Sequence, residues 1–531
     1  MIGSTGSWYL ANGGGSVRRD SRNQGATSRT GLVVVLVVAI VATACGARVA
    51  AYEPPIAGTG GSSAQAGGAQ AGGVTTTTGL SGAGGVGSGG GTAGGATGSG
   101  ATGSGGAGQA SGGPTGPAAK APVSPTSTGF DFSPHAEAAA CPGTAGNGAS
   151  DVGVTASQLT FGNVSGLTGP LTGSFSQGAQ GVQALFAAVD AAGGICGRKL
   201  ALDAEDDKQN ASTNASDVAD LVPKVLAFVG STSDADNGGV PGMTQANVPD
   251  IGFGINCNRS ESPVYWSPAG GSCNQPQGAN GPYYVSNGIF TLAKQGGYFP
   301  TKMAFLSYSI AISAAAAQEF EYVYKAMGGT VCYTDFAVSP ASASLESDVA
   351  AMQQAGCNGS FDTMDVTGNA KLLQAMQQQS YHPGYVAATF DAYTPAMIAA
   401  AGQSAAQNLI VGLPFVPLNE PQTMVQLYQQ QLSTYEPGAQ PSGFGFLAWE
   451  AAQMLLYALI QSGHAPTRAS IVKAFDSLQN WTGGGALGGY TPSGRGVYTC
   501  GVDVTVKGSS FARKAPSSGL FCGGQAAKAS S

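Results

Sequence analysis

The chain has 531 residues, of which 42% are hydrophobic and 10% are charged, and its net charge at pH 7 is −7. A chain that is acidic overall is not attracted to phosphate backbones, so we do not expect nucleic acid as a partner. The length allows two lobes of ordinary domain size behind any N-terminal extension.

The N-terminal region carries an export signal. Residues 32–44 form the apolar run LVVVLVVAIVATA, which follows four arginines and precedes Cys45. This run is shorter than the roughly 20 residues that a membrane-spanning helix needs. The small residues before Cys45 resemble a bacterial lipobox, with Ala42 where the lipobox usually has leucine. We therefore expect removal of residues 1–44 and acylation of Cys45. An ordinary signal peptide cut nearby is the alternative.

Residues 45–140 are predicted to form a tether. No charged residue occurs between Glu53 and Lys120, where Gly, Ala, Ser and Thr dominate. Such a segment cannot bury enough apolar surface to offset its ordering entropy, and it would span on the order of 50 Å. A wall-spanning or sugar-decorated stalk is the alternative interpretation of its Ser and Thr content.

After residue 150 the pattern becomes that of an α/β protein, with apolar runs separated by segments of helical period. We predict a first series of strands at 158–164, 199–207, 225–230 and 248–254, with helices near 182–189 and 212–222. We predict a second series of strands at 302–309, 330–339, 359–367, 385–391 and 408–416, with helices at 311–327, 345–355, 369–380, 444–463 and 468–478. Short strands follow residue 485. Two such series predict two lobes, and the chain is expected to pass from one lobe to the other several times.

The stretch from Thr160 to Asp207 resembles the type I periplasmic binding proteins of the branched-chain amino acid transporters. It contains the loop TGP, the corner GGICGRK and the acidic strand exit DD in the order found in that family. The resemblance implies a domain over residues 141–524 built from two Rossmann-like lobes, like a Venus flytrap, with a three-crossing hinge. The first lobe would span about 150–285 and 410–480, and the second about 286–409 and 481–524.

The resemblance also implies a function. A small-molecule ligand, an amino acid or a related amide or carboxylate, would be clamped between the lobes and passed to an ABC permease complex. We expect a monomer at the outer face of the cell membrane, attached through its lipid only, with no cofactor and no metal. A receptor or adaptor of the same fold that signals to a separate membrane partner is the alternative. We do not expect an enzyme, because His135, His382 and His464 do not fall on strand-end loops facing the expected cleft.

Candidate ligand contacts in the first lobe follow its strands. Ser231, Thr232 and Ser233 come directly after a strand, where free N–H groups at a helix start can hold a carboxylate. Simple N-capping by these hydroxyls is the alternative. The resemblance places Ser231 at a carboxylate contact, and Gly254 and Asn256 on the next exit loop.

Candidate contacts in the second lobe also end strands. Tyr308 and Asp391 close two predicted strands, and Asp391 resembles the acidic residue that faces a ligand ammonium in the family. Capping of the segment after Thr394 is the alternative role of Asp391. Thr367 and Asn369 stand where amino acid binders often have a tyrosine.

Eight cysteines follow Cys45, and an even number behind an export signal favours disulfides. Eight cysteines allow 105 pairings, and closeness in sequence favours Cys257–Cys273, Cys332–Cys357 and Cys500–Cys522, which leaves Cys141–Cys196. Tyr265 and Trp266 lie between Cys257 and Cys273, in a segment that we interpret as a surface flap closed by this disulfide.

The anchoring hypothesis is testable in cells. Replacing Cys45 by Ala should release the protein from the membrane fraction and abolish incorporation of labelled fatty acid, because the thiol is the acylation site. Two or more acyl chains are needed for firm anchoring, so the native protein should resist a salt wash. A Cys45→Ala protein that stays membrane-bound and labelled would contradict the hypothesis.

Overall fold

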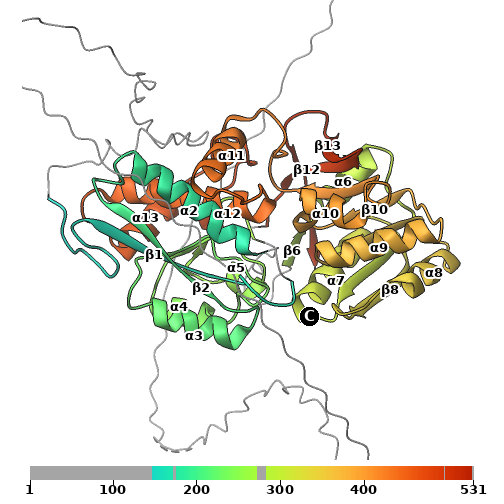
Figure 1. Ribbon diagram of the computed structural model, residues 1–531, viewed down its shortest axis with the longest axis horizontal. Helices are drawn as coiled ribbons and strands as arrows, with labels where there is room; N and C mark the ends of the chain where they lie inside the picture. The colour runs from blue at the N-terminus through green and yellow to red at the C-terminus, as the bar shows by residue number, and fades with distance from the viewer. Residues whose placement is uncertain (1–145, 172–174, 272–282, 495–496, 529–531) are drawn as a thin grey trace, which may run out of the picture. The chain divides into compact units, whose positions relative to one another are not determined.

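The computed structural model describes residues 146–171, 175–271, 283–494 and 497–528, all of which belong to the compact unit Gly108–Ser531. The signal segment, Cys45 and the tether lie outside the described residues, as do Cys141 and Cys273. The described residues form two α/β lobes, each built on its own sheet (Figure 1).

The first lobe contains a five-stranded sheet with the order β2-β1-β3-β4-β5, in which every pairing is parallel. Its strands are β1 (Gln158–Ser165), β2 (Lys199–Asp206), β3 (Phe228–Val229), β4 (Asp250–Ile251) and β5 (Tyr265–Trp266). The helices between them are α2 (Ser176–Ala191), α3 (Ala211–Leu221), α4 (Val240–Gln245) and α5 (Cys257–Ser260). The third and fourth strands are thus shorter than the sequence predicts.

The expected flap at Tyr265 and Trp266 is wrong, because these residues form the edge strand β5. Their side chains are only 2% and 1% exposed, and the Trp266 ring lies 5.5 Å from that of Phe475. Aromatic bulk between two cysteines therefore completes the core of the first lobe.

The second lobe contains a mixed sheet with the order β13-β12-β11-β10-β9-β7-β8. The strands from β7 to β11 pair in parallel, and the C-terminal strands join them in antiparallel pairing. The strands are β7 (Lys302–Tyr308), β8 (Thr330–Val338), β9 (Gly359–Asp362), β10 (Tyr385–Ala388), β11 (Leu409–Leu413), β12 (Cys500–Lys507) and β13 (Ser510–Ala515). A short strand β14 (Phe521–Cys522) pairs with β12, and β6 (Tyr283–Ser286) pairs with β15 (Gln525–Lys528).

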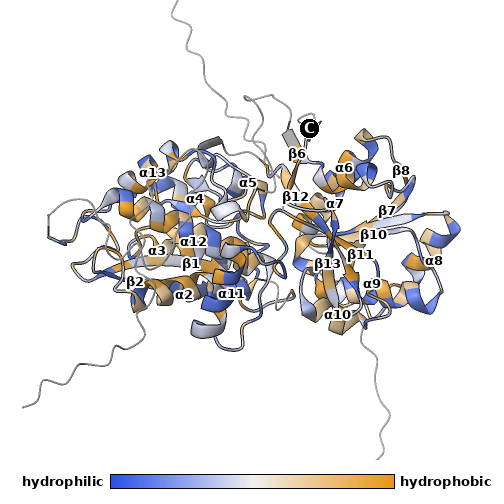
Figure 2. Ribbon diagram, turned by 90° about the horizontal axis from the view of Figure 1, so that it is seen from above, coloured by the Kyte–Doolittle hydropathy of each residue, from blue (hydrophilic) through white to orange (hydrophobic). Residues whose placement is uncertain are grey.

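The central strands of this sheet are apolar, as Figure 2 shows for β10 and β11, and they are largely buried. The edge strand β8 is half-buried and more polar. The helices of this lobe are α6 (Gly288–Gln295), α7 (Ala311–Ala326), α8 (Glu346–Gln354), α9 (Val366–Gln378) and α10 (Pro395–Ala401). The sequence places the change from the second lobe to the first near residue 410. Strand β11 (Leu409–Leu413) belongs to the sheet of the second lobe, so the chain leaves that lobe only after this strand.

After β11 the chain returns to the first lobe with α11 (Thr423–Tyr435), α12 (Gly443–Ser462) and α13 (Arg468–Ser477). Helix α12 packs against α2, β3 and β4, and then the chain crosses back into β12. Together with the passage from β5 to the second lobe, this makes three crossings. Helix α12 is long and apolar enough to cross a membrane, but its 18-residue apolar stretch is buried inside the protein, as expected for a core helix.

Close packing of α12 on α2 depends on a pair of glycines. A Cβ atom added at Gly181 would lie 2.2 Å from the carbonyl oxygen of Gly445, so a larger residue would force the two helices apart. Because α12 begins two residues before Gly445, this contact fixes the start of α12 against α2.

Two of the predicted disulfides, Cys332–Cys357 and Cys500–Cys522, are confirmed. The first links β8 to the turn before β9, and the second joins paired residues of β12 and β14. Cys196 and Cys257 are also disulfide-bonded, and their expected partners lie outside the described residues.

A buried arginine links the strand ends of the first lobe. Arg259 is 1% exposed and donates from Nε and Nη2 to both carboxylate oxygens of Asp250 at 2.7 and 2.8 Å. Its Nη1 donates to the Ser231 carbonyl at 2.9 Å and to Asp236 at 3.3 Å. Strand β4 and the loop after β3 are therefore held to α5 by one cation.

Replacing Arg259 by Met should lower the free energy of unfolding by about 3 to 5 kcal/mol, because two buried carboxylates would lose their counter-charge. Urea denaturation of the full-length protein measures this. The control is Lys325→Met, which removes the surface ion pair with Glu321 and should cost less than about 1 kcal/mol. Equal losses in the two variants would show that the buried network is not a main source of stability.

Candidate functional site

A cavity lies between the two lobes, at the carboxyl ends of the parallel strands of both sheets. In open α/β sheets this edge is where ligands bind, because loops and helix starts converge there. The first lobe contributes the loops after β3 and β4 and the start of α12, and the second contributes α6, α7, β12 and the loops after β9 and β10.

Aromatic rings form a continuous wall that passes from one lobe to the other. Phe175 lies 5.4 Å from Phe444, and Phe444 lies 4.8 Å from Phe390 between ring centroids. Phe390 of the second lobe meets Phe253 of the first edge to face at 5.2 Å, and Phe253 lies 6.4 Å from Tyr498. These rings make the cavity largely apolar and bring the lobes into contact across it.

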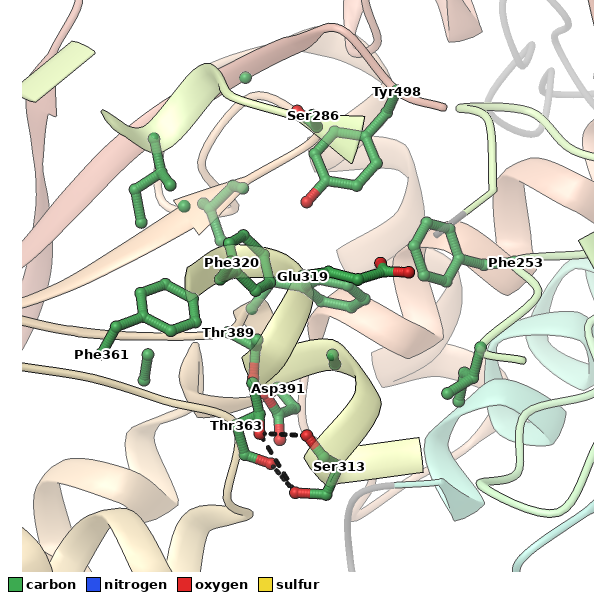
Figure 3. A pocket seen from close by; sticks show the side chains of 18 of the residues that line it. Phe253, Ser286, Ser313, Glu319, Phe320, Phe361, Thr363, Thr389, Asp391 and Tyr498 are labelled. Carbon is green, nitrogen blue, oxygen red and sulfur yellow. Dashed lines mark hydrogen bonds between the residues drawn. The ribbon is translucent and has the colours of Figure 1, made fainter. Parts of the chain in front are cut away.

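The charged groups of the cavity are all acidic. The described lining includes no Lys, Arg or His. It contains five carboxyl side chains, those of Asp234, Glu319, Asp365, Asp391 and Asp503. Figure 3 shows Asp391 grouped with Thr389, Thr363 and Ser313, and the Glu319 side chain directed from α7 toward Phe253.

Asp391 lies in the 3-10 turn Phe390–Ala392, directly after β10. Burial raises the pKa of its carboxyl to about 6, the hydroxyl of Thr389 opposes this by donating to Oδ1, and the charge of Asp365 adds to it. Asp391 is thus mostly ionised at pH 7 in a poorly hydrated place, where the charge would be stabilised by a positive ligand group.

The other acids of the cavity have similar surroundings. Burial raises the pKa of Asp234 to about 7, with a contribution from the charge of Asp207. Burial raises the pKa of Asp503 to about 8, although the Tyr298 hydroxyl donates to Oδ2 at 2.9 Å and Lys514 is nearby. Burial and then the charge of Glu319 raise the pKa of Tyr498 to about 12.

The three hydroxyl residues after β3 make contacts within the first lobe and do not line the cavity in the described structure. Ser231 Oγ accepts from the Val164 N–H at 3.1 Å, and Thr232 Oγ1 donates to the Phe175 carbonyl at 2.6 Å. Ser233 Oγ accepts from the N–H of Ala235 at 3.0 Å, which is a local turn contact. Ligand contact by these three residues stays a prediction.

Gly254 and Asn256 alternate with residues that do line the cavity. Asn256 donates from Nδ2 to the carbonyl of Asp234 at 2.8 Å and to Asp236 at 2.7 Å. Asn256 therefore positions the Asp234 loop. Gly254 donates its N–H to the Tyr265 hydroxyl, which ties this loop to β5.

Two predicted residues of the second lobe surround Asp365. The Tyr308 hydroxyl donates to Asp365 Oδ1 at 2.6 Å, and Asn369 Nδ2 donates to the Asp365 carbonyl at 3.0 Å. Asp365 also caps α9 by accepting from the Gly368 N–H at 3.0 Å. Thr367 is exposed on the first turn of α9. Of the nine predicted ligand contacts, Asp391 is the one in the described lining.

Sequence reasoning missed several residues of the lining, chiefly Glu319, Asp503, Phe253 and Tyr498. Asp503 had a signal, because an acid interrupts the apolar strand GVDVTV and faces the interior with no exposed surface. Glu319 had none, since a glutamate in the middle of a helix usually faces solvent. Segments more than 180 residues apart supply Glu319 and Asp503, so only folding brings them together.

The sequence profile described as periplasmic binding protein matches residues 158–509. No curated protein matches the chain in sequence.

Solved structures share the fold at low identity. The substrate-binding protein of a fatty acid ABC transporter from Thermomonospora curvata is 16% identical with a TM-score of 0.57, covering 70% of this chain and 94% of that one. A branched-chain amino acid ABC transporter protein from Thermus thermophilus with bound valine is 15% identical with a TM-score of 0.58, covering 68% and 96%. An ABC transporter solute-binding protein from R. palustris in complex with 4-hydroxybenzoate is 14% identical with a TM-score of 0.56, covering 68% and 97%. The chain therefore belongs to the periplasmic binding protein family, a family of solute-binding proteins and not of enzymes, and has the two parallel-sheet lobes of its type I members.

Proposed function

We propose that this protein is an extracytoplasmic lipoprotein that captures a small organic ligand between its lobes and delivers it to an ABC importer. The observation that carries the proposal is the cavity whose walls come from both lobes and contain carboxyl groups on each side. A ligand in this position contacts both walls at once only when the lobes are close, and this differential contact favours closure.

As the ligand we propose an amino acid or a related amide or carboxylate. Asp391 would receive its ammonium or amide group, because the desolvated carboxylate gains a charge-assisted hydrogen bond there. Ser231, Thr232, Ser233 and the N–H groups around them are the proposed partners of a ligand carboxylate. The remaining predicted residues would support these contacts by positioning the cavity loops: Gly254, Asn256, Tyr308, Thr367 and Asn369.

The importer is proposed as the partner on two grounds. The similar structures from Thermomonospora curvata, Thermus thermophilus and R. palustris are all named as ABC transporter proteins. An acylated Cys45 followed by a tether that ends near residue 140 would hold the binding domain within reach of a permease in the same membrane. The protein would act there as a monomer.

Removing the charge of Asp391 should weaken ligand binding. A thermal-shift screen of amino acids, amides and small carboxylates would first identify a ligand, since one present at 100 times its dissociation constant stabilises by about 2.7 kcal/mol. Asp391→Asn should then reduce the affinity for an ammonium or amide ligand by about 2 to 3 kcal/mol in isothermal calorimetry. The control is Asp476→Asn on the exposed face of α13, which should leave the dissociation constant unchanged. Unchanged affinity in both variants would place the site elsewhere.

The same variant should stabilise the ligand-free protein. The pKa of Asp391 in the folded state is about 6, above its ordinary value of 3.8, and Asp365 and Asp362 are its titratable neighbours. Ionisation of Asp391 therefore costs stability as the pH rises from about 4 to 6. Asp391→Asn removes this cost, which we put at about 1 to 2 kcal/mol after allowing for solvent screening at this half-buried site.

Urea denaturation at pH 4 and at pH 7.5 measures this effect. The stability of the Asp391→Asn variant should exceed that of the native protein at pH 7.5 and match it near pH 4. A variant that is less stable at both pH values would show that Asp391 has a structural role instead.

A further inference from the structure

The cavity between the lobes has a branch that continues into the second lobe, between its sheet and helices α6 and α7. Ile289 and Leu292 of α6, Phe320 of α7 and Phe361 of β9 line this branch. Figure 3 shows Phe320 and Phe361 on the side of the cavity away from Phe253. Because these side chains are all apolar, the branch is suited to an apolar part of a ligand.

A glycine leaves room for this branch. Gly412 lies inside strand β11 and lines the cavity. A Cβ atom added there would lie 3.2 Å from Cδ1 of Ile289, so any larger side chain would fill the space beside α6. The backbone of Gly412 is not in the left-handed region, and its conformation therefore does not require glycine. Glycine weakens a strand, and a glycine inside one often marks the close approach of a ligand.

An acid with a free oxygen atom lies beside Gly412. Asp503 of β12 pairs with Gly412 across the sheet and also lines the cavity. It is fully buried. Its Oδ2 accepts from the Tyr298 hydroxyl at 2.9 Å, whereas its Oδ1 has no hydrogen-bond partner among the described residues. Because buried polar atoms are normally paired in native proteins, Oδ1 calls for a partner from the molecule that occupies the cavity.

The protonation of Asp503 restricts the chemistry of that partner. Burial raises the pKa of its carboxyl to about 8, against the opposing effects of the Tyr298 hydroxyl and the charge of Lys514. Burial also raises the pKa of Tyr385, its other titratable neighbour, which therefore stays uncharged. Asp503 is thus mainly neutral at pH 7. A hydroxyl group can accept from the protonated carboxyl and donate to the ionised one, whereas an ammonium can only donate and a carboxylate can only accept.

The sheet sets the distance between this acid and Asp391. Ala388 at the end of β10 pairs with Val411 of β11, and the next residue of β11, Gly412, pairs with Asp503. Two strand spacings, roughly 10 Å, therefore separate the end of β10 from this part of β12. A ligand that reaches from Asp391 to Asp503 needs a phenyl ring or an alkyl chain between its polar ends.

We infer that this branch is a subsite for the far end of the ligand, where a hydroxyl group at the tip of an apolar side chain hydrogen-bonds to Asp503. The inference rests on the proposed function, because Asp391 would hold the ammonium or amide group at the other end. It narrows the proposed ligand to an amino acid, or a related amide or carboxylate, with a long apolar side chain that ends in a phenol or an alcohol.

Matched pairs of compounds test the hydroxyl group by itself. The pairs are tyrosine with phenylalanine, and 6-hydroxynorleucine with norleucine. Binding to the full-length protein is measured by isothermal calorimetry at pH 7. In at least one pair we expect the hydroxylated compound to bind ten-fold or more tightly than its partner, because the partner leaves Asp503 Oδ1 buried and unpaired.

Variants then assign this preference to Asp503. Asp503→Leu should bring the ratio of the two affinities to about one, since leucine has a similar size and no polar atom. The control is Thr505→Val, which should keep the ratio. Thr505 lies two residues along β12, is buried, and has an unpaired Oγ1, but it does not belong to the described lining.

A variant of the glycine tests the space of the branch. Gly412→Val should weaken the binding of both members of a pair at least ten-fold, because the new side chain fills the branch. Valine is favoured in strands, so this variant should fold, and it tests the subsite even where Asp503→Leu does not fold. The thermal midpoint of each variant without ligand shows whether it is folded.

Several results would overturn the inference. Equal affinities within both pairs would do so, as would a preference that persists in Asp503→Leu, and both would leave the proposed function intact. Failure of all four compounds to bind would also overturn it. The proposed function fails separately if a compound from the wider screen binds with an affinity that Asp391→Asn, Gly412→Val and Phe253→Leu all leave unchanged.

Discussion

The buried charge of Arg259 is the constraint on which the first lobe depends. Its guanidinium contacts Asp250, the first residue of β4, as well as Asp236 in the loop after β3 and the carbonyl of Ser231. Asp236 in turn accepts the N–H of Ile255 at 2.8 Å, and Ile255 lines the cavity. One wall of the cavity between the lobes is therefore built on an ion network that is only stable while every partner is present.

The acids of the cavity have the opposite arrangement. Asp236 and Asp250 share a cation, whereas Asp391 and Asp234 have none in the described structure, and burial raises the pKa of both. Groups that destabilise the empty protein are a known feature of binding and catalytic sites, because the cost is recovered when the ligand supplies the missing partner. In the proposed ligand site, pairing of Asp391 with a positive group of the ligand would contribute favourably to the binding free energy.

Contacts between the lobes are suited to opening and closing. Phe390 from the second lobe touches Phe253 and Phe444 from the first, and each such ring pair contributes only about 0.5 to 1.5 kcal/mol beyond the area that it buries. Contacts of this size can break and form again. In contrast, α12 is packed rigidly on α2 through Gly181 and Gly445, so motion would be confined to the crossings.

The amino-acid sequence was sufficient to predict the α/β class of the protein and the order of most of its elements. Hydrophobic periodicity predicts nearly every strand and long helix. The buried strands are marked by continuous apolar runs such as KMAFLSYS, and the helices by apolar residues at regular helical spacing. Closeness in sequence was enough for Cys332–Cys357 and Cys500–Cys522, since each pair joins neighbouring strands or their connecting turn. The residues that line the cavity, in contrast, became known only from the folded structure. Glu319, Asp503 and Phe253 come from three distant segments, and their side chains meet because the carboxyl ends of two sheets face each other, which no local pattern encodes.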